Sequence, residues 1–501
     1  MEMALLAGID VGTSGCKVGI FSEDGKLISF SSREYPLNYP REGYAELNVN
    51  QVLQNVESCI KEAVLHVDRY EIKSLSVSSL GEAVVPIDKD GNILYSSILN
   101  FDIRGEEYLN RIRNFISEKE IYQINGNIFG NHYTMPKLMW IKEYEKQVYD
   151  RTYKFLPWTS FISYILGAEP YVDYSLANRT LLFDINKEEW SEKLLKIAGI
   201  EKEKLPSVVP AGTEIGKVSK DAEKRTGLPS GIPIIAGAHD QCCNAVGCGV
   251  IEEDIAMYGM GTYLCIVPNF KERISADFML KNGFNTEHHS AKGKFVTLIY
   301  NLGGLLVRWY RDTFAQKEKS EKDIYYKLFS EIKMEGESDI FVIPYFTTIG
   351  VPYFLSNTKG IIFGLKLETE RQDILKGIIE GSCFHMLECM EEFSKVRKIN
   401  EYRVVGGGSK SDIWIKITCD IFGKTFKKPK ISEAGCLGAA ILAGAGCGIF
   451  SSFEEGVLSM VKIEKIFEPD LKKNQYYRKK FEKYKELKKI WEEIWKKFMT
   501  L

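Results

Sequence analysis

The sequence predicts an α/β protein made of two lobes with similar architecture. The chain has 501 residues, which is more than one hydrophobic core normally supports. Apolar runs typical of buried strands alternate with stretches of helical spacing. A strand, a glycine–threonine turn and a returning strand occur at the start of the chain and again halfway along it. We therefore predict an N-terminal domain, residues 1–248, and a C-terminal domain, residues 249–501.

The two hairpins share one order of elements. In the first, an apolar run that ends in Asp10 leads into a tight turn at residues 11–15 and a returning strand at 16–22. In the second, the strand at 255–258 leads into the turn at 259–262 and then into another strand. The resemblance between the two is weak as sequence, but their spacing favours a repeated architecture.

Other elements follow from periodicity. Residues 51–66 and 104–118 carry helical spacing, and residues 74–87 read as buried strands that end before a turn at 90–91. The tail, residues 474–501, has lysines on one face and apolar side chains at helical spacing on the other. It predicts an amphipathic helix that docks on the protein rather than anchoring it to a membrane. The apolar positions are Tyr477, Phe481, Tyr484, Ile490, Ile494 and Phe498.

Composition narrows the class of partner. Lysine and arginine number 66 and aspartate and glutamate 68, so the net charge of -2 favours neither a nucleic acid nor a membrane surface. No apolar run approaches the roughly 20 residues that span a bilayer, and the start lacks the basic segment of a signal peptide. The eleven cysteines and six histidines show no zinc-ligand spacing. We expect reduced thiols and a cytoplasmic protein.

Three glycine-bearing turns could bind phosphate, because glycine lets backbone N–H groups approach an anion closely. They lie at residues 12–15, 259–262 and 406–409, and each carries a hydroxyl side chain. Lys17 could add a positive charge to the first. Each turn alone is more often only a turn, whereas three of them together favour a phosphate site.

Two aspartates follow apolar strands, where α/β folds place their sites. Asp10 stands directly before the first glycine turn and is a candidate magnesium ligand. Asp240 ends the apolar stretch 232–238 after His239, which we read as a packed histidine rather than a catalytic one. Glu82 also follows an apolar strand and could accept hydrogen bonds from sugar hydroxyls. Either aspartate, viewed alone, could be a simple helix cap or turn former.

In order along the chain, the motifs resemble those of the FGGY family of carbohydrate kinases, which includes glycerol kinase, xylulokinase, ribulokinase and gluconokinase. The resemblance covers nearly the whole chain, and the ordered set is more specific than any single piece. The matching segments are 8–14 (GIDVGTS), 100–104 (NFDIR), 137–140 (KLMW), 173–177 (DYSLA), 226–228 (TGL), 231–233 (GIP), 237–241 (GAHDQ), 259–262 (GMGT), 303–312, 406–412 (GGGSKSD) and 433–440 (EAGCLGAA).

The resemblance implies two actin-like (ribonuclease-H-like) domains with an interdomain cleft, ATP against the C-terminal lobe and the sugar against the N-terminal lobe. Asp240 matches the catalytic aspartate, and Asp10, with Asp240, would hold Mg²⁺. Residues implied to bind ATP are Gly12, Thr13, Ser14, Lys17, Gly261, Thr262, Gly304, Arg308, Gly407, Gly408 and Asp412. Two of these depart from glycerol kinase, which has glutamine in place of Arg308 and asparagine in place of Asp412.

The residues implied to bind the sugar differ more from those of glycerol kinase and xylulokinase than the ATP residues do. The implied substrate residues are Gly81, Glu82, His132, Asp240 and Gln241. Glycerol kinase would have arginine at Gly81 and tyrosine at His132, and the Gln-Met-His run typical of xylulokinases is absent. We expect Gly81 to leave space for a substrate larger than glycerol.

The predicted function is ATP-dependent phosphorylation of a pentulose or short polyol, with Asp240 as general base. Glycerol kinase is the alternative within the family. Outside the family's reaction, the alternatives are an actin-like ATPase whose output is conformational and a non-catalytic sugar-binding regulator. The predicted partners are a small sugar or polyol and, as one assembly we consider, a second copy in a homodimer.

Overall fold

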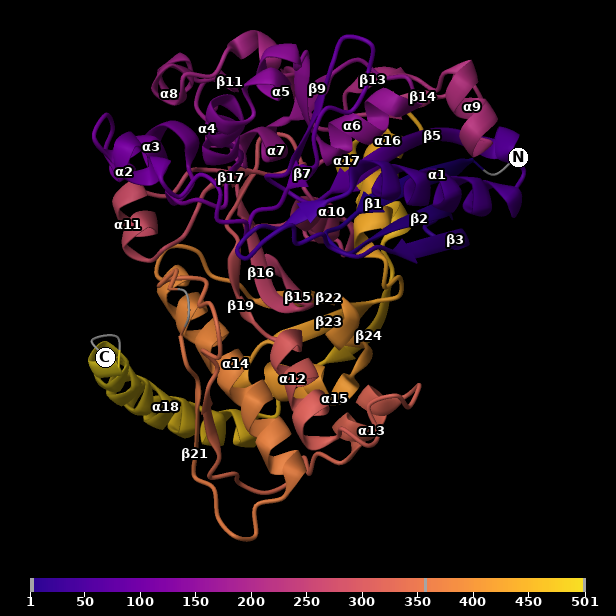
Figure 1. The fold of residues 1–501 in the computed structure, drawn as a ribbon. Coiled ribbons are helices and arrows are strands. Elements are labelled where there is room, and N and C mark those ends of the chain that lie inside the picture. Colours follow the sequence, from indigo (N-terminus) through magenta and orange to yellow (C-terminus); the bar gives the residue numbers. More distant parts are fainter. Residues whose placement is uncertain (1–3, 356–357, 499–501) are drawn as a thin grey trace.

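The computed structural model describes residues 4–355 and 358–498 as two lobes, each built around a β-sheet (Figure 1). The sheet of the N-terminal lobe has the order β13-β14-β5-β1-β2-β3. Strand β1 pairs antiparallel with β2 and parallel with β5, which in turn pairs parallel with β14. The bounds are β1 Leu5–Val11, β2 Gly15–Ser22, β3 Leu27–Glu34, β5 Ile72–Ser79, β13 Glu214–Lys217 and β14 Pro233–Ile235.

The sheet of the C-terminal lobe repeats this plan. Strand β15 pairs antiparallel with β16 and parallel with β22, β22 pairs parallel with β23, and β24 and β19 close the two ends. The order β24-β23-β22-β15-β16-β19 therefore matches the N-terminal sheet strand for strand, which confirms the predicted repeat of the two hairpins. The bounds are β15 Ile255–Met260, β16 Tyr263–Phe270, β19 Ile299–Leu302, β22 Glu401–Val405, β23 Thr425–Pro429 and β24 Ile463–Phe467.

Helices cover the N-terminal sheet and build a second apolar cluster beside it. Helix α1 (Val49–Leu65) packs on β2 and β3, and α6 (Trp158–Leu166) packs on β5. The remaining elements of this half are β4 Glu46–Leu47, β6 Val84–Ile87, β7 Ser97–Ile98, α2 Tyr108–Arg113, α3 Glu118–Asn125, α4 Thr134–Tyr144, α5 Lys146–Arg151, β8 Lys154–Pro157, β9 Tyr171–Asp173, α7 Tyr174–Asn178, β10 Phe183–Asp184, β11 Glu189–Trp190, α8 Glu192–Ala198, β12 Ser207–Val209, α9 Lys220–Thr226 and α10 Asp240–Gly247.

The helix predicted at 104–118 is shorter than its spacing indicated. Helix α2 spans only Tyr108–Arg113, and Ser117 caps the next helix, α3. Arg104 is held instead by the carboxylates of Asp102 and Glu46, at 2.5 and 2.7 Å, and the backbone of Gly105 has φ +95°. Tertiary ion pairing and a left-handed glycine therefore stop the helical pattern from starting at Arg104.

Helix α16 (Ala434–Gly446) belongs to the second half of the chain but packs on β1 and β5 of the N-terminal sheet and on α10. Figure 1 shows α16 and α17 (Phe453–Met460) in late-chain colours among the indigo strands. The contact is backbone against backbone. A Cβ at Gly8 would lie 1.8 Å from the Cys436 carbonyl oxygen, and one at Gly438 would lie 1.9 Å from that of Cys243.

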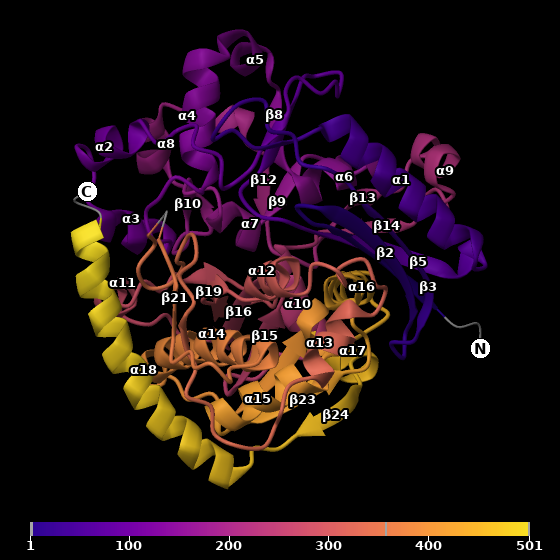
Figure 2. The ribbon, with the colours of Figure 1, turned by 60° about the horizontal axis from the view of Figure 1, so that its bottom comes forward.

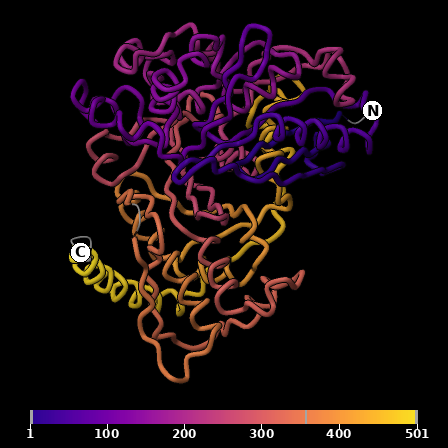
Figure 3. Tube along the Cα trace, in the orientation of Figure 1, coloured from indigo at the N-terminus to yellow at the C-terminus, as the bar shows by residue number. Residues whose placement is uncertain are grey.

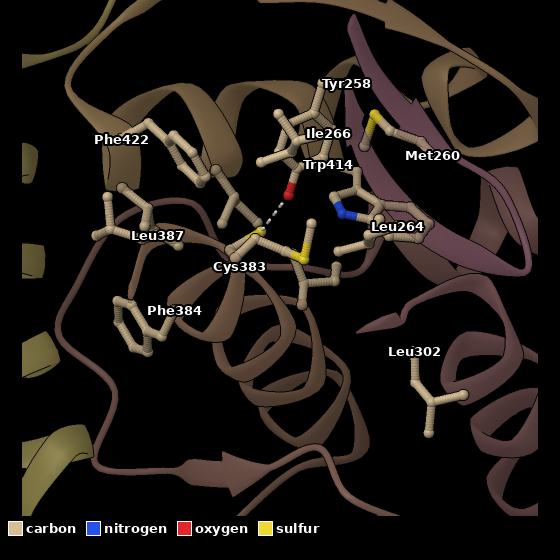
Figure 4. Packing of buried hydrophobic residues seen from close by; sticks show 14 of the residues in the cluster. Tyr258, Met260, Leu264, Ile266, Leu302, Cys383, Phe384, Leu387, Trp414 and Phe422 are labelled. Atoms are coloured by element: carbon tan, nitrogen blue, oxygen red, sulfur yellow. Dashed lines mark hydrogen bonds between the residues drawn. The ribbon is translucent and has the colours of Figure 1, made fainter. Parts of the chain in front are cut away.

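The core of the C-terminal lobe lies between its sheet and the helices α14 (Arg371–Phe393) and α15 (Asp412–Phe422). Figure 4 shows its centre, where the Tyr258 hydroxyl lies 3.9 Å from Cys383 Sγ beside the Trp414 ring. Other elements of this half are α11 Ala276–Lys281, β17 Glu287–His288, β18 Phe295–Val296, α12 Gly304–Phe314, α13 Ile324–Ser330, β20 Phe341–Ile343 and β21 Ile361–Phe363.

The last helix, α18 (Leu471–Phe498), runs along the outside of the C-terminal lobe (Figure 2), and the two chain ends lie on different lobes (Figure 3). It buries Tyr477, Phe481 and Tyr484 against α14 and α15, whereas Ile490 and Ile494 are 53% and 39% exposed. The side chain of Phe498 and residues 499–501 lie outside the described part of the chain. Within residues 4–355 and 358–498, the longest apolar helices fall short of what a membrane crossing requires.

We predict that Gly438→Val destabilises the protein, because its side chain would overlap the Cys243 backbone, which has no flexible end to move. Overpacking of this kind lowers the free energy of unfolding by about 1–3 kcal/mol or more. Thermal unfolding measures the effect. Gly407→Ala is the control, because among the described atoms a Cβ at Gly407 meets nothing within 4 Å. Equal unfolding temperatures for the two variants would contradict the close packing.

Candidate active site

The site begins where three parallel strands end side by side. Strands β1, β5 and β14 are neighbours, so Asp10, Ser78 and the residues after β14 reach the same edge of the sheet. Ser78 Oγ donates a hydrogen bond of 2.8 Å to Asp10 Oδ1, and Ser79 pairs with His239 in an isolated bridge. Asp240 then opens helix α10. The sheet order thus brings together the two aspartates that the sequence predicts, with β5 between their strands.

Both carboxyl groups hold protons more tightly than usual. Burial, with the nearby Asp10, raises the pKa of Asp240 to about 7. Burial also raises the pKa of Asp10, against the hydrogen bond from Ser78 and the positive charge of Lys17. Like charges in a desolvated site repel, so Asp10 adds to the rise at Asp240, and the nearby Glu433 adds to the rise at Asp10. A cation between them would relieve that repulsion.

Two neighbours hold the Asp240 side chain. Gln241 Nε2 donates to Asp240 Oδ1 at 3.0 Å, so the amide that is predicted to meet substrate lies against the aspartate. His239 Nε2 lies 3.3 Å from the same oxygen. Burial and the charge of Arg179 lower the pKa of His239 well below its usual range, so the ring is neutral at physiological pH. Both contacts orient Asp240 without cancelling its charge.

The space expected beside Gly81 is filled. A Cβ at this position would lie 3.0 Å from His239 Nε2 and 3.3 Å from Arg179 Cγ. A larger residue here would push these two side chains aside by a few tenths of an ångström, so the extra room expected beside Gly81 is already taken up by His239 and Arg179. Arg179, supplied from the end of helix α7, occupies this space.

Arg179 binds two carboxylates. Its Nη2 donates to Glu82 Oε1, and its Nη1 donates to Glu287 Oε1 at 2.5 Å. Glu82 has the left-handed φ of 63° and comes directly after β5, while Glu287 lies in β17 of the second half. Asn100 Nδ2 reaches Glu82 Oε2 at 3.5 Å. The site therefore has an anionic end that both halves of the chain supply.

His132 adjoins this cluster through the two residues that follow it, Tyr133 and Thr134. Its ring packs on Tyr133 at a centroid distance of 4.0 Å, and the Arg179 guanidinium lies 5.0 Å from the centre of the same tyrosine. Thr134 Oγ1 donates to the Glu82 carbonyl at 2.5 Å. Burial and the charge of Lys137 lower the pKa of His132 to about 4, so it is a neutral donor or acceptor.

The first glycine turn is fixed by backbone contacts and carries a paired lysine. Gly12 N donates to Gly15 O at 2.9 Å, and Tyr35 donates to the Gly12 carbonyl at 2.6 Å. Lys17 Nζ lies 2.6 Å from Glu433 Oε2, just before helix α16. Thr13 is half-buried and Ser14 is exposed on the same turn.

The predicted nucleotide residues of the second half gather around its hairpin. Gly304 N donates to Gly261 O at 2.9 Å, and a Cβ at Gly408 would lie 2.9 Å from Met260 Cβ. Thr262 accepts from Leu305 N at 3.0 Å through its carbonyl. The three glycine segments of this half, around residues 261, 304 and 407, are therefore neighbours.

Two charged residues predicted at the nucleotide site differ in their surroundings. Arg308 is exposed on helix α12. Asp412 opens helix α15, and its carboxylate lies 2.6 Å from Lys465 Nζ and 3.3 Å from Lys428 Nζ. The Asp412 carboxylate therefore already accepts from two lysines, which leaves it fewer hydrogen bonds for a nucleotide.

Sequence reasoning missed four residues of the site, namely Ser78, Asn100, Arg179 and Glu287. Ser78, Asn100 and Arg179 stand in or beside segments that drew attention for other reasons. No local pattern marks Glu287, because its position depends on long-range packing between β17 and α7.

Comparison with known proteins agrees with this arrangement. The N-terminal domain of the FGGY family of carbohydrate kinases matches residues 5–247, and the C-terminal domain of that family matches residues 260–447. The xylulose kinase of Bacillus subtilis is 28% identical over 489 residues, 97% of each chain. The glycerol kinase of Thermococcus gammatolerans is 28% identical over 485 residues, 94% of each chain.

Solved structures show the same fold. A ligand-bound xylulose kinase from Lactobacillus acidophilus superposes with a TM-score of 0.87 at 23% identity, over 99% of this chain and 100% of its own. A gluconate kinase from the same organism gives 0.88 at 22% identity, over the same shares. These likenesses confirm the predicted two-domain actin-like fold. Because the two family domains together cover most of the chain, the protein belongs to the FGGY family of carbohydrate kinases.

Proposed function

We propose that the acceptor of this ATP-dependent sugar or polyol kinase is a five-carbon ketose, and that Asp240 is the base that activates its hydroxyl. One observation carries the assignment of the base. Asp240 is a carboxylate at a strand-end edge with a pKa of about 7, raised by burial and by Asp10. A general base works best when its pKa lies near the operating pH.

In this mechanism Asp240 accepts the hydroxyl proton while the sugar oxygen bonds to the γ-phosphorus. Gln241 and His239 hold the carboxylate in one orientation, which is the positioning that phosphoryl transfer mainly requires. When bound, Mg²⁺–ATP would supply the phosphoryl group, and the bond between the γ-phosphorus and the departing ADP oxygen would break. Asp240 returns the proton to solvent after product leaves.

The residues present fit magnesium and a nucleotide. Asp10 and Asp240 are two buried carboxylates that repel one another, and Mg²⁺ in kinases binds through one or two carboxylates plus phosphate oxygens and water. In the residues that the structure describes, no cluster of three or more metal-binding side chains forms a closed protein cage. Asp10 with Asp240 would hold the metal.

The nucleotide contacts are proposed from the glycine segments. Backbone N–H groups of both hairpin turns, with the hydroxyls of Thr13, Ser14 and Thr262, suit phosphate oxygens. Further contacts on the C-terminal lobe are proposed for Gly304, Arg308, Gly407, Gly408 and Asp412. Lys17 is shared with Glu433, so it would act on a phosphate as one member of an ion pair.

Two observations support a pentulose over glycerol. The polar end formed by Glu82, Arg179, Glu287 and Asn100 combines a guanidinium donor with carboxylate acceptors, which suits a ligand that carries a carbonyl beside its hydroxyls, as a pentulose does and glycerol does not. Several relatives are named xylulose kinases, among them that of Bacillus subtilis. Glycerol kinase is the second candidate, because relatives with that name match at the same identity.

Two further assignments extend this proposal, a cytoplasmic location and a homodimer. All eleven cysteines are free thiols, which suits the reducing cytoplasm. A homodimer stays a prediction, which the molecular mass of the purified protein in solution checks.

We predict that Asp240→Asn lowers kcat by about 10²–10⁴-fold, because the amide cannot accept the hydroxyl proton. The substitution keeps the size of the side chain, so ADP binding and the unfolding temperature should stay close to those of the parent protein. Steady-state kinetics with each tested sugar measures the loss. Wild-type turnover by this variant would exclude Asp240 as the base.

We predict that kcat/KM for the sugar rises with pH and levels off above about pH 7. The base must be deprotonated, and below a pKa of about 7 the deprotonated fraction of Asp240 falls about tenfold per pH unit. A profile measured between pH 5 and 9 checks this. A flat profile across pH 5–7 would mean that another group limits the reaction.

We predict that D-xylulose, D-ribulose or L-ribulose gives the highest kcat/KM, and that glycerol is poorer by about 10²-fold or more. A site that hydrogen-bonds several hydroxyls rejects ligands that lack them, because its own groups are left unpaired. The comparison includes erythritol and uses one set of conditions. A preference for glycerol would overturn the pentulose assignment but not the kinase.

A further inference from the structure

A buried ion triad lies beside the proposed base and is not explained by folding alone. Arg179 joins Glu82 of the N-terminal lobe to Glu287 of the second half. Their side chains are only 10%, 5% and 0% exposed. Charges buried this deeply normally have all their hydrogen bonds made.

This triad leaves bonds unmade. Among the described residues, Arg179 Nε and Glu287 Oε2 are buried without a hydrogen-bond partner. Glu82 Oε2 has only the long contact of 3.5 Å from Asn100 Nδ2. Asn285 Nδ2 donates to Glu287, but to the oxygen that already accepts from Arg179. One free donor and two underused acceptors therefore remain, and the triad carries one formal positive and two formal negative charges.

The triad also touches the catalytic neighbourhood. Arg179 Cγ and the His239 ring converge on the same point beside Gly81, and His239 Nε2 lies 3.3 Å from Asp240 Oδ1. The charge of Arg179 opposes the rise in the pKa of Asp240, which shows that the two are electrostatic neighbours. The unmade bonds thus belong to a cluster that reaches the proposed base through His239.

Docking of the second half does not depend on this triad. Backbone and neutral side-chain hydrogen bonds already join the same surfaces. Thr286 N donates to Gly126 O at 2.7 Å, His288 N donates to Asn178 Oδ1 at 2.9 Å, and the Tyr122 hydroxyl donates to Phe284 O at 3.1 Å. An ion triad with unmade bonds adds little to an interface that is secured in this way.

We propose that Arg179 is a specificity-determining residue that donates to the carbonyl or hydroxyl oxygen of the sugar acceptor, while Glu82 and Glu287 accept from its hydroxyls. A ketose carbonyl is an acceptor only, so it needs a donor such as a guanidinium, and the two carboxylates need hydroxyl donors. The matching ligand has a carbonyl next to hydroxyl-bearing carbons. This inference rests on the proposed function and refines its acceptor end.

The test compares Arg179→Lys and Glu287→Gln with the parent protein. Each acceptor is paired with the polyol of the same carbon skeleton, D-xylulose with xylitol and D-ribulose with ribitol. We expect both variants to raise KM for the ketose by about 10- to 100-fold with KM for ATP changed by no more than about threefold. Arg179→Lys should also reduce the preference for ketose over polyol, since the donor fork is lost.

Arg104→Lys is the matched control, because Arg104 is also buried in a triad, with Asp102 and Glu46, and the bonds of that triad are made. This control should lower the unfolding temperature and leave KM for the sugar unchanged. If Arg179→Lys behaves like Arg104→Lys, or if Glu287→Gln leaves sugar binding unchanged by calorimetry without ATP, the proposal is overturned. If Arg179→Lys does not fold, Glu287→Gln decides alone.

This experiment tests the role of Arg179 and Glu287 separately from the assignment of a pentulose as the acceptor. Should the best acceptor of the parent protein be a polyol, the pentulose assignment fails, yet the two variants must still raise KM for that acceptor. Should the best acceptor be a pentulose and the variants leave its KM unchanged, the pentulose assignment holds and the role of Arg179 and Glu287 fails.

Discussion

The site depends on one contact, the backbone of helix α16 lying against β1 and α10. Gly8 and Gly438 allow carbonyl oxygens to approach positions where any side chain would overlap them. Because Asp10 ends β1 and Asp240 opens α10, this contact sets how far apart the two carboxylates stand. It also brings the start of α16 close to Asp10, because a Cβ added at Gly435 would lie only 2.9 Å from the Asp10 carboxylate. A helix of the second half thereby supports the catalytic edge of the first.

Close packing at this edge produces an electrostatic imbalance. Asp10 and Asp240 are buried near one another, and burial raises the pKa of each. An unliganded site of this kind is unfavourable for folding, since each ionised carboxylate has lost much of its hydration without gaining a full counter-charge. The same imbalance suits a proton acceptor and a bound divalent cation, which explains why such a cluster persists beside the most tightly packed backbone of the molecule.

Local chemistry was predictable and long-range packing was not. Both hairpins and the strand-end aspartates were found from the sequence, because a strand, a glycine turn and a carboxylate are adjacent in the chain. The helix at 104–118 was overestimated because Arg104 pairs with Asp102, two residues before it, and with Glu46, 58 residues away. Arg179 and Glu287 are 108 residues apart, and nothing near either residue signals the other. The room expected beside Gly81 is taken up because Arg179 reaches that position from the end of helix α7.

These differences explain why overall similarity does not identify the acceptor. In the proposed function, the phosphates would be bound mostly by backbone groups of turns that the fold itself fixes, with Lys17 and Asp412 held in ion pairs. The acceptor side is built from side chains that come from three separate segments, around Glu82, Arg179 and Glu287. Those side chains can change without moving the backbone. Xylulose and glycerol kinases can therefore resemble this chain equally, at 28% identity, while in our proposal a few positions beside Asp240 would decide which hydroxyl compound binds.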